Sequence, residues 1–264
     1  MATDKFKIKN TLFRTALKIM GNRGLSKNIV GKIVRDYGIQ NCRTNEITIN
    51  GYKMILDKED IMQLSLFPYE PVETEVVKQH VKKHDVVVDV GANMGYYTLL
   101  LAKLNAIVYS FEPEPANFAL LKRNVELNNF TNVTLYNKAA SDTNGKAKLV
   151  LADYGTGQHT LESSKFGTRT IDVETTTIDL QDIAFAKIDV EGAELLVLKG
   201  MKALPKKMLI EFNTDNLKEH GTTPTEFFNF VKNYSIKQAT KNGLVEVDYE
   251  KLVENKMATN LFLY

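Results

Sequence analysis

Acidic side chains cluster in the segment AKIDVEGAELLVLKGM, where Asp189, Glu191 and Glu194 fall within six residues. Asp189 ends a predicted strand, and Glu191 begins the turn that follows it. Because ligands of a parallel sheet bind beyond the carboxyl ends of its strands, we expect Asp189 and Glu191 to reach a cleft. Glu194 is expected to face solvent or to support the start of the next helix. The alternative interpretation is that Asp189 or Glu191 only caps that helix.

A glycine-containing turn interrupts the segment VVVDVGANMGYYTLL, residues 86–100. Gly91 and Gly95 lie where a buried strand must turn sharply into a helix. Glycine accepts positive φ and lets a ligand approach the backbone, because it has no Cβ atom. The helix that begins there presents free N–H groups to an anionic group, so the turn is a candidate binding loop. A tight strand–helix turn without a ligand is the alternative.

Asn93 indicates which ligand suits this loop. A nicotinamide dinucleotide uses G-x-G-x-x-G, with its pyrophosphate over the second glycine, and Asn93 occupies that place here. The loop instead suits a smaller group with one carboxylate and one ammonium, which is the methionine end of S-adenosylmethionine. Asp89 is positioned to receive the ammonium or to brace the loop amides. An NAD-dependent oxidoreductase on a similar sheet and a non-catalytic cofactor-binding protein are the competing functions.

Glu112 is the candidate ribose ligand. It follows the next predicted strand, in YSFEPEPANF, 17 residues after Gly95 (112 − 95). A carboxylate at this position can accept hydrogen bonds from both ribose hydroxyls, as in dinucleotide folds. Such charge-assisted hydrogen bonds are strong. A solvent-facing glutamate is the alternative, and we expect the neighbouring Glu114 to be solvated at the mouth of the site.

The strands and helices that must position these groups can be followed along the chain. From residue 86, apolar runs alternate with helical spacing, which predicts a mostly parallel α/β sheet with helices on both faces. Strands are predicted at 86–90, 107–111, 132–137, 146–151, 184–190, 207–213 and 259–264, and helices at 71–83, 95–104, 192–200, 224–233 and from Pro113 onward.

The first part of the chain has a different pattern. Residues 1–68 are predicted to form a small N-terminal extension, followed by the cofactor-binding domain at 69–264. The extension contains an amphipathic helix in TLFRTALKIM, which we expect to dock against the main domain, with contact to a membrane surface as the alternative. Asn50-Gly51 lies between two alternating runs and predicts a β-hairpin.

The composition argues against several classes of protein. Lys and Arg total 34 against 32 for Asp and Glu, so nothing favours a nucleic-acid partner. No stretch approaches the ~20 apolar residues of a transmembrane segment, and Arg14 and Lys18 interrupt any signal peptide. The single cysteine, Cys42, cannot form an intramolecular disulfide, so we expect a reducing, cytoplasmic location, with indifference to the redox state as the alternative. The oligomeric state is not encoded in any readable pattern.

Several of these segments together resemble the FkbM family of S-adenosylmethionine-dependent methyltransferases. The resemblance runs from YEPVETEVV through VVVDVGANMGYYTLLLA, FEPEPANFALLKRNVELNN, KAASDTNGKAKL and TTIDL to IDVEGAELLVLKGM. It implies the class I methyltransferase fold, a Rossmann-like sheet of seven strands, mostly parallel, whose last strand is antiparallel. It also implies O-methylation of a hydroxyl group on a sugar, a glycan or a secondary metabolite.

The resemblance assigns one group of residues to the methionine side of S-adenosyl-L-methionine. Asp89, Gly91, Asn93 and Gly95 line that side, and Thr98 adds a hydroxyl group. These assignments agree with the binding loop inferred from the residues themselves.

A second group is assigned to the adenosine side and to the cover of the cofactor. Glu112 binds the ribose, Pro113 packs near the adenine, and Ala140 lies along the base. Tyr69 and Glu73, which precede the first strand of the domain, close over the cofactor.

The resemblance places Asp189 and Glu191 beside the transferred methyl group. An alcohol acceptor must lose its proton, and Asp189 is the first candidate for the general base, with Glu191 positioning the acceptor or sharing the role. His159, in the glycine-flanked loop YGTGQHTL, is the alternative base, or a surface-loop histidine. Asp189 and Glu191 could chelate a divalent cation, but neither spacing nor resemblance requires one, so we expect no metal.

Overall fold

The computed structural model of the 264-residue chain describes residues 9–15, 37–38, 40, 42, 44–57, 60, 62–151, 160–161, 169–254 and 258–264. The chain divides into two compact units, Met1–Glu70 and Pro71–Tyr264, each described by itself. Within the described residues, no helix combines the length and the apolar composition needed to cross a bilayer.

The N-terminal unit contains the predicted hairpin. Strands β1 (Glu46–Ile49) and β2 (Tyr52–Ile55) pair antiparallel around Asn50-Gly51, both of which have positive φ. The alternating side chains Ile47, Tyr52 and Met54 are buried. A helix over residues 9–15 forms the start of the predicted amphipathic helix, and the rest of that prediction lies outside the described residues.

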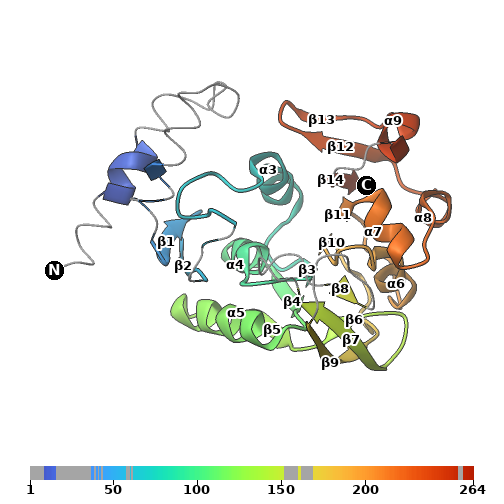
Figure 1. Cartoon of the computed structure of the whole chain (residues 1–264), viewed down its shortest axis with the longest axis horizontal. Helices are drawn as coiled ribbons and strands as arrows, with labels where there is room; N and C mark the ends of the chain where they lie inside the picture. Colours follow the sequence, from blue (N-terminus) through green and yellow to red (C-terminus); the bar gives the residue numbers. More distant parts are fainter. Residues whose placement is uncertain are drawn as a thin grey trace. The chain divides into compact units, whose positions relative to one another are not determined.

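The main sheet belongs to the second unit (Figure 1) and follows the order β13-β12-β14-β11-β10-β3-β4-β5. Its strands are β3 (Val86–Val90), β4 (Ile107–Phe111), β5 (Val133–Tyr136), β10 (Phe185–Ile188), β11 (Met208–Phe212), β12 (Ile236–Thr240), β13 (Gly243–Glu246) and β14 (Thr259–Leu263). The five strands β11, β10, β3, β4 and β5 are parallel to one another. The last strand, β14, pairs antiparallel with β11 and β12, so the predicted class I arrangement is confirmed.

The strand count differs from the expected seven, because the main sheet has eight strands among the described residues. The additional strand is β13, which pairs antiparallel with β12 at the edge of the sheet. Gly243, with φ +109°, lets the chain reverse directly after β12 and return beside it.

The helices of the second unit are α3 (Pro71–His80), α4 (Tyr96–Lys103), α5 (Pro115–Leu127), α6 (Glu194–Lys199), α7 (Thr214–Glu219), α8 (Pro224–Phe230) and α9 (Tyr249–Glu254). Figure 1 shows α4 and α5 beside the half of the sheet that contains β3 to β5, and α6 to α8 beside the half that contains β10 to β12. Val88, Ile188 and Ile210, from three neighbouring strands, belong to one buried apolar cluster, which holds the centre of the sheet rigid.

The part of the chain between β5 and β10 forms a second sheet of four strands, ordered β6-β9-β7-β8. Its strands are β6 (Ala139–Ala140), β7 (Gly145–Leu151), β8 (Thr160–Leu161) and β9 (Arg169–Thr176). The predicted strand at 146–151 is β7, whereas β6, β8 and β9 were not predicted. Ala139, Leu149 and Val173 form the small apolar core of this sheet.

Candidate functional site

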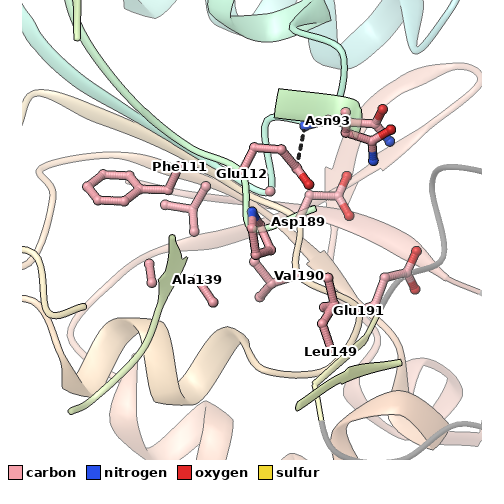
Figure 2. A pocket seen from close by; sticks show the side chains of 13 residues that line it. Asn93, Phe111, Glu112, Ala139, Leu149, Asp189, Val190 and Glu191 are labelled. Atoms are coloured by element: carbon pink, nitrogen blue, oxygen red, sulfur yellow. Dashed lines mark hydrogen bonds between the residues drawn. The ribbon is translucent and has the colours of Figure 1, made fainter. Parts of the chain in front are cut away.

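A pocket opens at the carboxyl ends of β3, β4 and β10 (Figure 2), as expected for ligands of a parallel sheet. The empty space between its walls, counted together with the open mouth, is about 540 Å³. Its lining residues are Val90, Gly91, Asn93, Phe111, Glu112, Pro113, Asn117, Ala139, Ala140, Leu149, Asp189, Val190 and Glu191.

Gly91 ends β3 in a position that only glycine fits. Its φ is +78°, and a Cβ atom added to it would lie 1.8 Å from the backbone oxygen of Asp189. Its N–H donates a hydrogen bond to the Phe111 carbonyl at 3.0 Å. The chain can therefore pass between the ends of β4 and β10 only because this residue has no side chain.

Asn93 forms the tip of the loop and adopts φ +49°, a conformation that asparagine tolerates better than most residues. Its N–H donates to Oε2 of Glu112 at 2.8 Å, and its own Oδ1 accepts from the Met94 N–H at 2.7 Å. Gly95, with φ +101°, then begins α4 against Leu121. The loop is thus tied to β4 by a carboxylate rather than left open for two phosphate groups.

Glu112 is buried and accepts one hydrogen bond on each carboxylate oxygen. Oε2 accepts from Asn93 N–H, and Oε1 accepts from Glu114 N–H at 2.9 Å. Each carboxylate oxygen has two lone pairs, so both atoms retain acceptor capacity for a pair of hydroxyl groups. Burial raises the pKa of Glu112 to about 7, and the hydrogen bonds from the two amides oppose that rise.

Asp89 and Thr98 lie beneath the loop rather than on the pocket surface. Asp89 is buried, and its Oδ2 accepts a 2.6 Å hydrogen bond from the Thr98 hydroxyl, which also contacts Ser110 Oγ at 2.9 Å. Burial raises the pKa of Asp89 to about 6. This contact ties Asp89 to α4, and its predicted role toward the cofactor or the loop amides stays a prediction.

Asp189 and Glu191 both line the pocket, and Figure 2 shows their carboxylates pointing the same way as that of Glu112. The Asp189 side chain is 26% exposed and accepts a 2.8 Å hydrogen bond from Nζ of the buried Lys187. Glu191 adopts φ +53° and accepts from Asn216 Nδ2 at 2.8 Å.

Asp189 and Glu191 differ in the charges that surround them. Burial, followed by the neighbouring charges of Asp189 and Glu194, raises the pKa of Glu191 to about 8. Glu211, inside β11, also has a raised pKa because of burial and the charge of Asp189. Lys187 forms an ion pair with Asp189, so its positive charge acts most directly on the Asp189 carboxylate.

Neither Asp189 nor Glu191 caps α6, whose N-cap is Ala193 without a side-chain hydrogen bond, so the capping alternative is wrong. Glu194 supports the helix start instead: it is buried, and its Oε1 accepts from Gly192 N–H at 3.0 Å and Val190 N–H at 3.3 Å. Burial raises the pKa of Glu194 to about 7.

Glu114 also differs from its expected role as a solvated side chain. It is the N-cap of α5, and its Oε2 accepts from Asn117 N–H at 2.6 Å. Pro115 at the first helical position then suits the fixed φ of proline.

Asp189, Glu191 and Glu211 bring carboxylate oxygens within 4.8 Å of one another. Repulsion between such groups must be relieved by protonation or by a cation. The Lys187 ammonium, 2.8 Å from Asp189 Oδ2, already supplies a positive charge there, and we assign no metal to the cluster.

The other predicted site residues are distributed as follows. Pro113 and Ala140 line the pocket. Glu73 accepts a hydrogen bond from Asn260 Nδ2 at 3.3 Å and is not among the lining residues. Tyr69 belongs to the N-terminal unit, and His159 lies outside the described residues, so both assignments stay predictions.

Three polar residues on the side of the pocket formed by Asp189 and Glu191 were not predicted from the sequence: Lys187, Asn216 and Glu211. Lys187 and Glu211 lie inside apolar strands, where their burial next to Asp189 depends on sheet pairing. Asn216 lies in α7, a helix that the pattern did not predict. A charged residue within an otherwise apolar predicted strand was the one available signal.

The chain is similar to several known proteins. Residues 89–237 match the methyltransferase FkbM domain. Methyltransferase 1 of Beauveria bassiana is 27% identical over 143 residues, which are 44% of this chain and 57% of that protein, less than two thirds of its length. The uncharacterized protein MJ1452 of Methanocaldococcus jannaschii is 22% identical over 206 residues, 77% of this chain and 73% of that protein.

Among solved structures, M. jannaschii TYW2, in complex with AdoMet, is similar to this chain. The sequence identity is 16%, the coverage is 84% of this chain and 86% of that chain, and the TM-score is 0.46. The family match spans more than half of the 264 residues, from Asp89 to Lys237. This protein therefore belongs to the FkbM family of methyltransferases, which use S-adenosylmethionine as methyl donor.

Proposed function

We propose that this protein transfers the methyl group of S-adenosylmethionine to a hydroxyl oxygen on a sugar, a glycan or a secondary metabolite. The observation that carries the proposal is that Glu112 and the acids Asp189 and Glu191 line a single pocket (Figure 2). One pocket can thus hold a ribose at one side and an acceptor hydroxyl at the other.

The chemical groups of S-adenosylmethionine can be matched one by one with parts of the pocket. We assign the methionine carboxylate and ammonium to the loop from Gly91 to Gly95, where α4 begins, and the ribose hydroxyls to Glu112. We assign the adenine to the space beside Pro113 and Ala140, which lies next to Phe111. Phe111 stacks on Tyr136 with centroids 4.6 Å apart and 7° between the rings, so this wall of the pocket is flat and rigid.

Methyl transfer needs little from the protein beyond alignment and removal of one proton. The acceptor oxygen attacks the methyl carbon, the carbon–sulfur bond breaks, and its electron pair passes to sulfur. Holding the three atoms in line is worth roughly 7–11 kcal/mol. The hydroxyl proton passes to Asp189, and a general base of this kind contributes ~10²–10⁴-fold.

Glu191 is assigned to acceptor positioning. With a pKa of about 8, it carries a proton at neutral pH and can donate a hydrogen bond to an acceptor oxygen. Its hydrogen bond from Asn216 holds the side chain in place. His159 is the alternative base, and replacing it tests whether the proton leaves by that route.

Acceptor recognition is assigned to the second sheet and to the segment that follows β11. Leu149 of β7 lines the pocket, and the chain continues from β7 into the hydroxyl-rich and glycine-rich segment DYGTGQHTLESSKFGTRT. Asn216, which lies in the segment that follows β11, donates a hydrogen bond to Glu191. Uncharged polyhydroxylated acceptors suit the acidic surroundings, because anionic acceptors would be repelled.

The deciding experiment is mass spectrometry of candidate glycans and hydroxylated metabolites incubated with the enzyme and a deuterated methyl donor. The proposal expects a labelled methyl ether, and its loss in Asp189→Asn. Label on nitrogen or carbon would contradict O-methylation, and tight cofactor binding without label on any acceptor would favour a non-catalytic protein. We further propose a cytoplasmic location, which the single Cys42 favours and cell fractionation would test.

A further inference from the structure

Lys187 is a buried cation in the centre of the main sheet. It lies in β10, between β3 and β11, and its side chain is 1% exposed. An ammonium group that is removed from water must be compensated by specific partners. Its position therefore calls for a reason other than packing, because an apolar side chain would fill the same space.

The contacts of Lys187 point toward the pocket. Nζ donates to Asp189 Oδ2 at 2.8 Å and to Asn260 Oδ1 at 3.3 Å, and it lies 5.3 Å from the centre of the Tyr97 ring. Asn260 in turn donates to Glu73 Oε1 from α3. Residues two apart in a strand have their side chains on the same face of the sheet, so the side chains of Lys187 and Asp189 lie next to each other.

Acids surround Asp189 from every element packed near it. Asp89 comes from β3, Glu191 from the turn after β10, Glu194 from α6, and Glu211 from β11. Among the described residues, Lys187 is the cation whose charge acts on Asp189, Glu191 and Glu211. Carboxyl groups this close cannot all be ionised, so a fixed positive charge decides which of them loses its proton.

We propose that Lys187 is a positioning residue for methyl transfer, which keeps Asp189 ionised within this acidic cluster and orients its carboxylate toward the acceptor hydroxyl. The inference rests on the proposed function, because it supplies the base that O-methylation requires. By holding Oδ2, Lys187 leaves the other oxygen of Asp189 for the acceptor proton. Glu191, with its pKa raised to about 8, then holds a proton and can serve as a hydrogen-bond donor.

The first test measures the dependence of kcat on pH in wild type and Lys187→Met, which removes the charge and retains most of the side-chain length. An opposite charge within ~4–6 Å favours the ionised form of an acid by about 1–3 pH units. The acid limb of the kcat profile should therefore move up by about one to three pH units, with a rate loss that grows as the pH falls and recovery at higher pH. The affinity for S-adenosylhomocysteine should change less than about threefold, because Lys187 is not a lining residue.

Two control variants separate charge from packing. Lys187→Arg retains the charge and should restore the position of the acid limb. Lys207→Met removes another part-buried lysine, which contacts His80 at 3.1 Å away from the pocket, and should leave the profile unchanged. An unmoved acid limb in Lys187→Met, or an equal shift in Lys207→Met, would overturn the proposal.

A second test needs no acceptor and so distinguishes failure of this inference from failure of the proposed function. Equilibrium unfolding is compared at pH 5 and pH 8 for wild type, Lys187→Met, Asp189→Asn and the double variant. The unfolding constant of Lys187→Met relative to wild type should be higher at pH 8 than at pH 5, because unfolding releases the trapped proton. Asp189→Asn in the same background should reduce this pH dependence, because Glu191 and Glu211 retain their share of it. A loss that is equal at both pH values, or a pH dependence that is undiminished in the double variant, would refute the role of Lys187 even if methyl transfer to oxygen is found.

Discussion

Gly91→Ala tests the close approach between the cofactor loop and the acidic strand. At this position an added Cβ atom would lie 1.8 Å from the Asp189 backbone oxygen and 2.8 Å from its carbonyl carbon. Real Cβ contacts are not found below 3.0 Å, so the two segments must separate by at least 1.2 Å (3.0 − 1.8). Backbone atoms cannot rotate away as a side chain can, and the ends of β3 and β10 must move.

The expected loss of unfolding free energy in Gly91→Ala has two contributions. A left-handed conformation costs a non-glycine residue about 1–2 kcal/mol. Forced overpacking costs a further ~1–3 kcal/mol, and often the higher value where backbone is involved. Gly91→Ala should therefore lower the free energy of unfolding by about 2–5 kcal/mol.

Gly221→Ala is the matched control. Gly221 has φ +70°, close to the +78° of Gly91, but nothing lies within 4 Å of its added Cβ atom. It should lose only the ~1–2 kcal/mol of backbone strain and retain cofactor affinity. Urea unfolding and calorimetric titration with S-adenosylhomocysteine measure both quantities, and Gly91→Ala should bind at least about tenfold more weakly. Equal losses of stability, with unchanged affinity in both variants, would refute the close approach.

Three further predictions concern the carboxylates. Asp189→Asn should lower kcat by ~10²–10⁴-fold and leave S-adenosylhomocysteine affinity nearly unchanged; equal losses in both would move Asp189 to a binding role. Glu112→Gln should weaken binding of S-adenosylhomocysteine and of adenosine alike by ~10–100-fold, since hydrogen bonds to a charged group contribute about 1.5–3 kcal/mol; unaffected adenosine binding in calorimetry would argue against the ribose role. Glu194, with its pKa raised from 4.5 to about 7, contributes stability that is present below pH 4.5 and lost as the pH rises through 7. Glu194→Gln should therefore gain stability relative to wild type by about 3 kcal/mol between pH 4 and pH 8, at 1.36 kcal/mol for each of about 2.5 pH units, and a difference independent of pH in urea unfolding would contradict this.

The binding side of the pocket was largely predictable from local patterns. The apolar run 86–90 followed by glycines predicts β3 and its turn, and a carboxylate directly after the next apolar run predicts Glu112 at the same sheet edge. Such features depend on neighbours in the sequence, and parallel strands bring their carboxyl ends together without further information.

The acidic side depends on contacts that are distant in the sequence. Lys187 and Asn260 are 73 residues apart, and their contact arises from the pairing of β10 with β11 and of β11 with β14. Glu211 has the same origin, since β11 brings it beside Asp189. Strands β12 and β13 of the main sheet were both missed. The short segment of β13, GLVE, has little apolar alternation and pairs only at the sheet edge.

The most direct test of the account is a crystal structure of the protein with S-adenosylhomocysteine. The account predicts that both ribose hydroxyls donate to the Glu112 carboxylate, that the methionine end meets the loop from Gly91 to Gly95, and that the sulfur atom faces Asp189. A nucleoside bound outside this pocket, or bound within it with the ribose away from Glu112, would contradict the account.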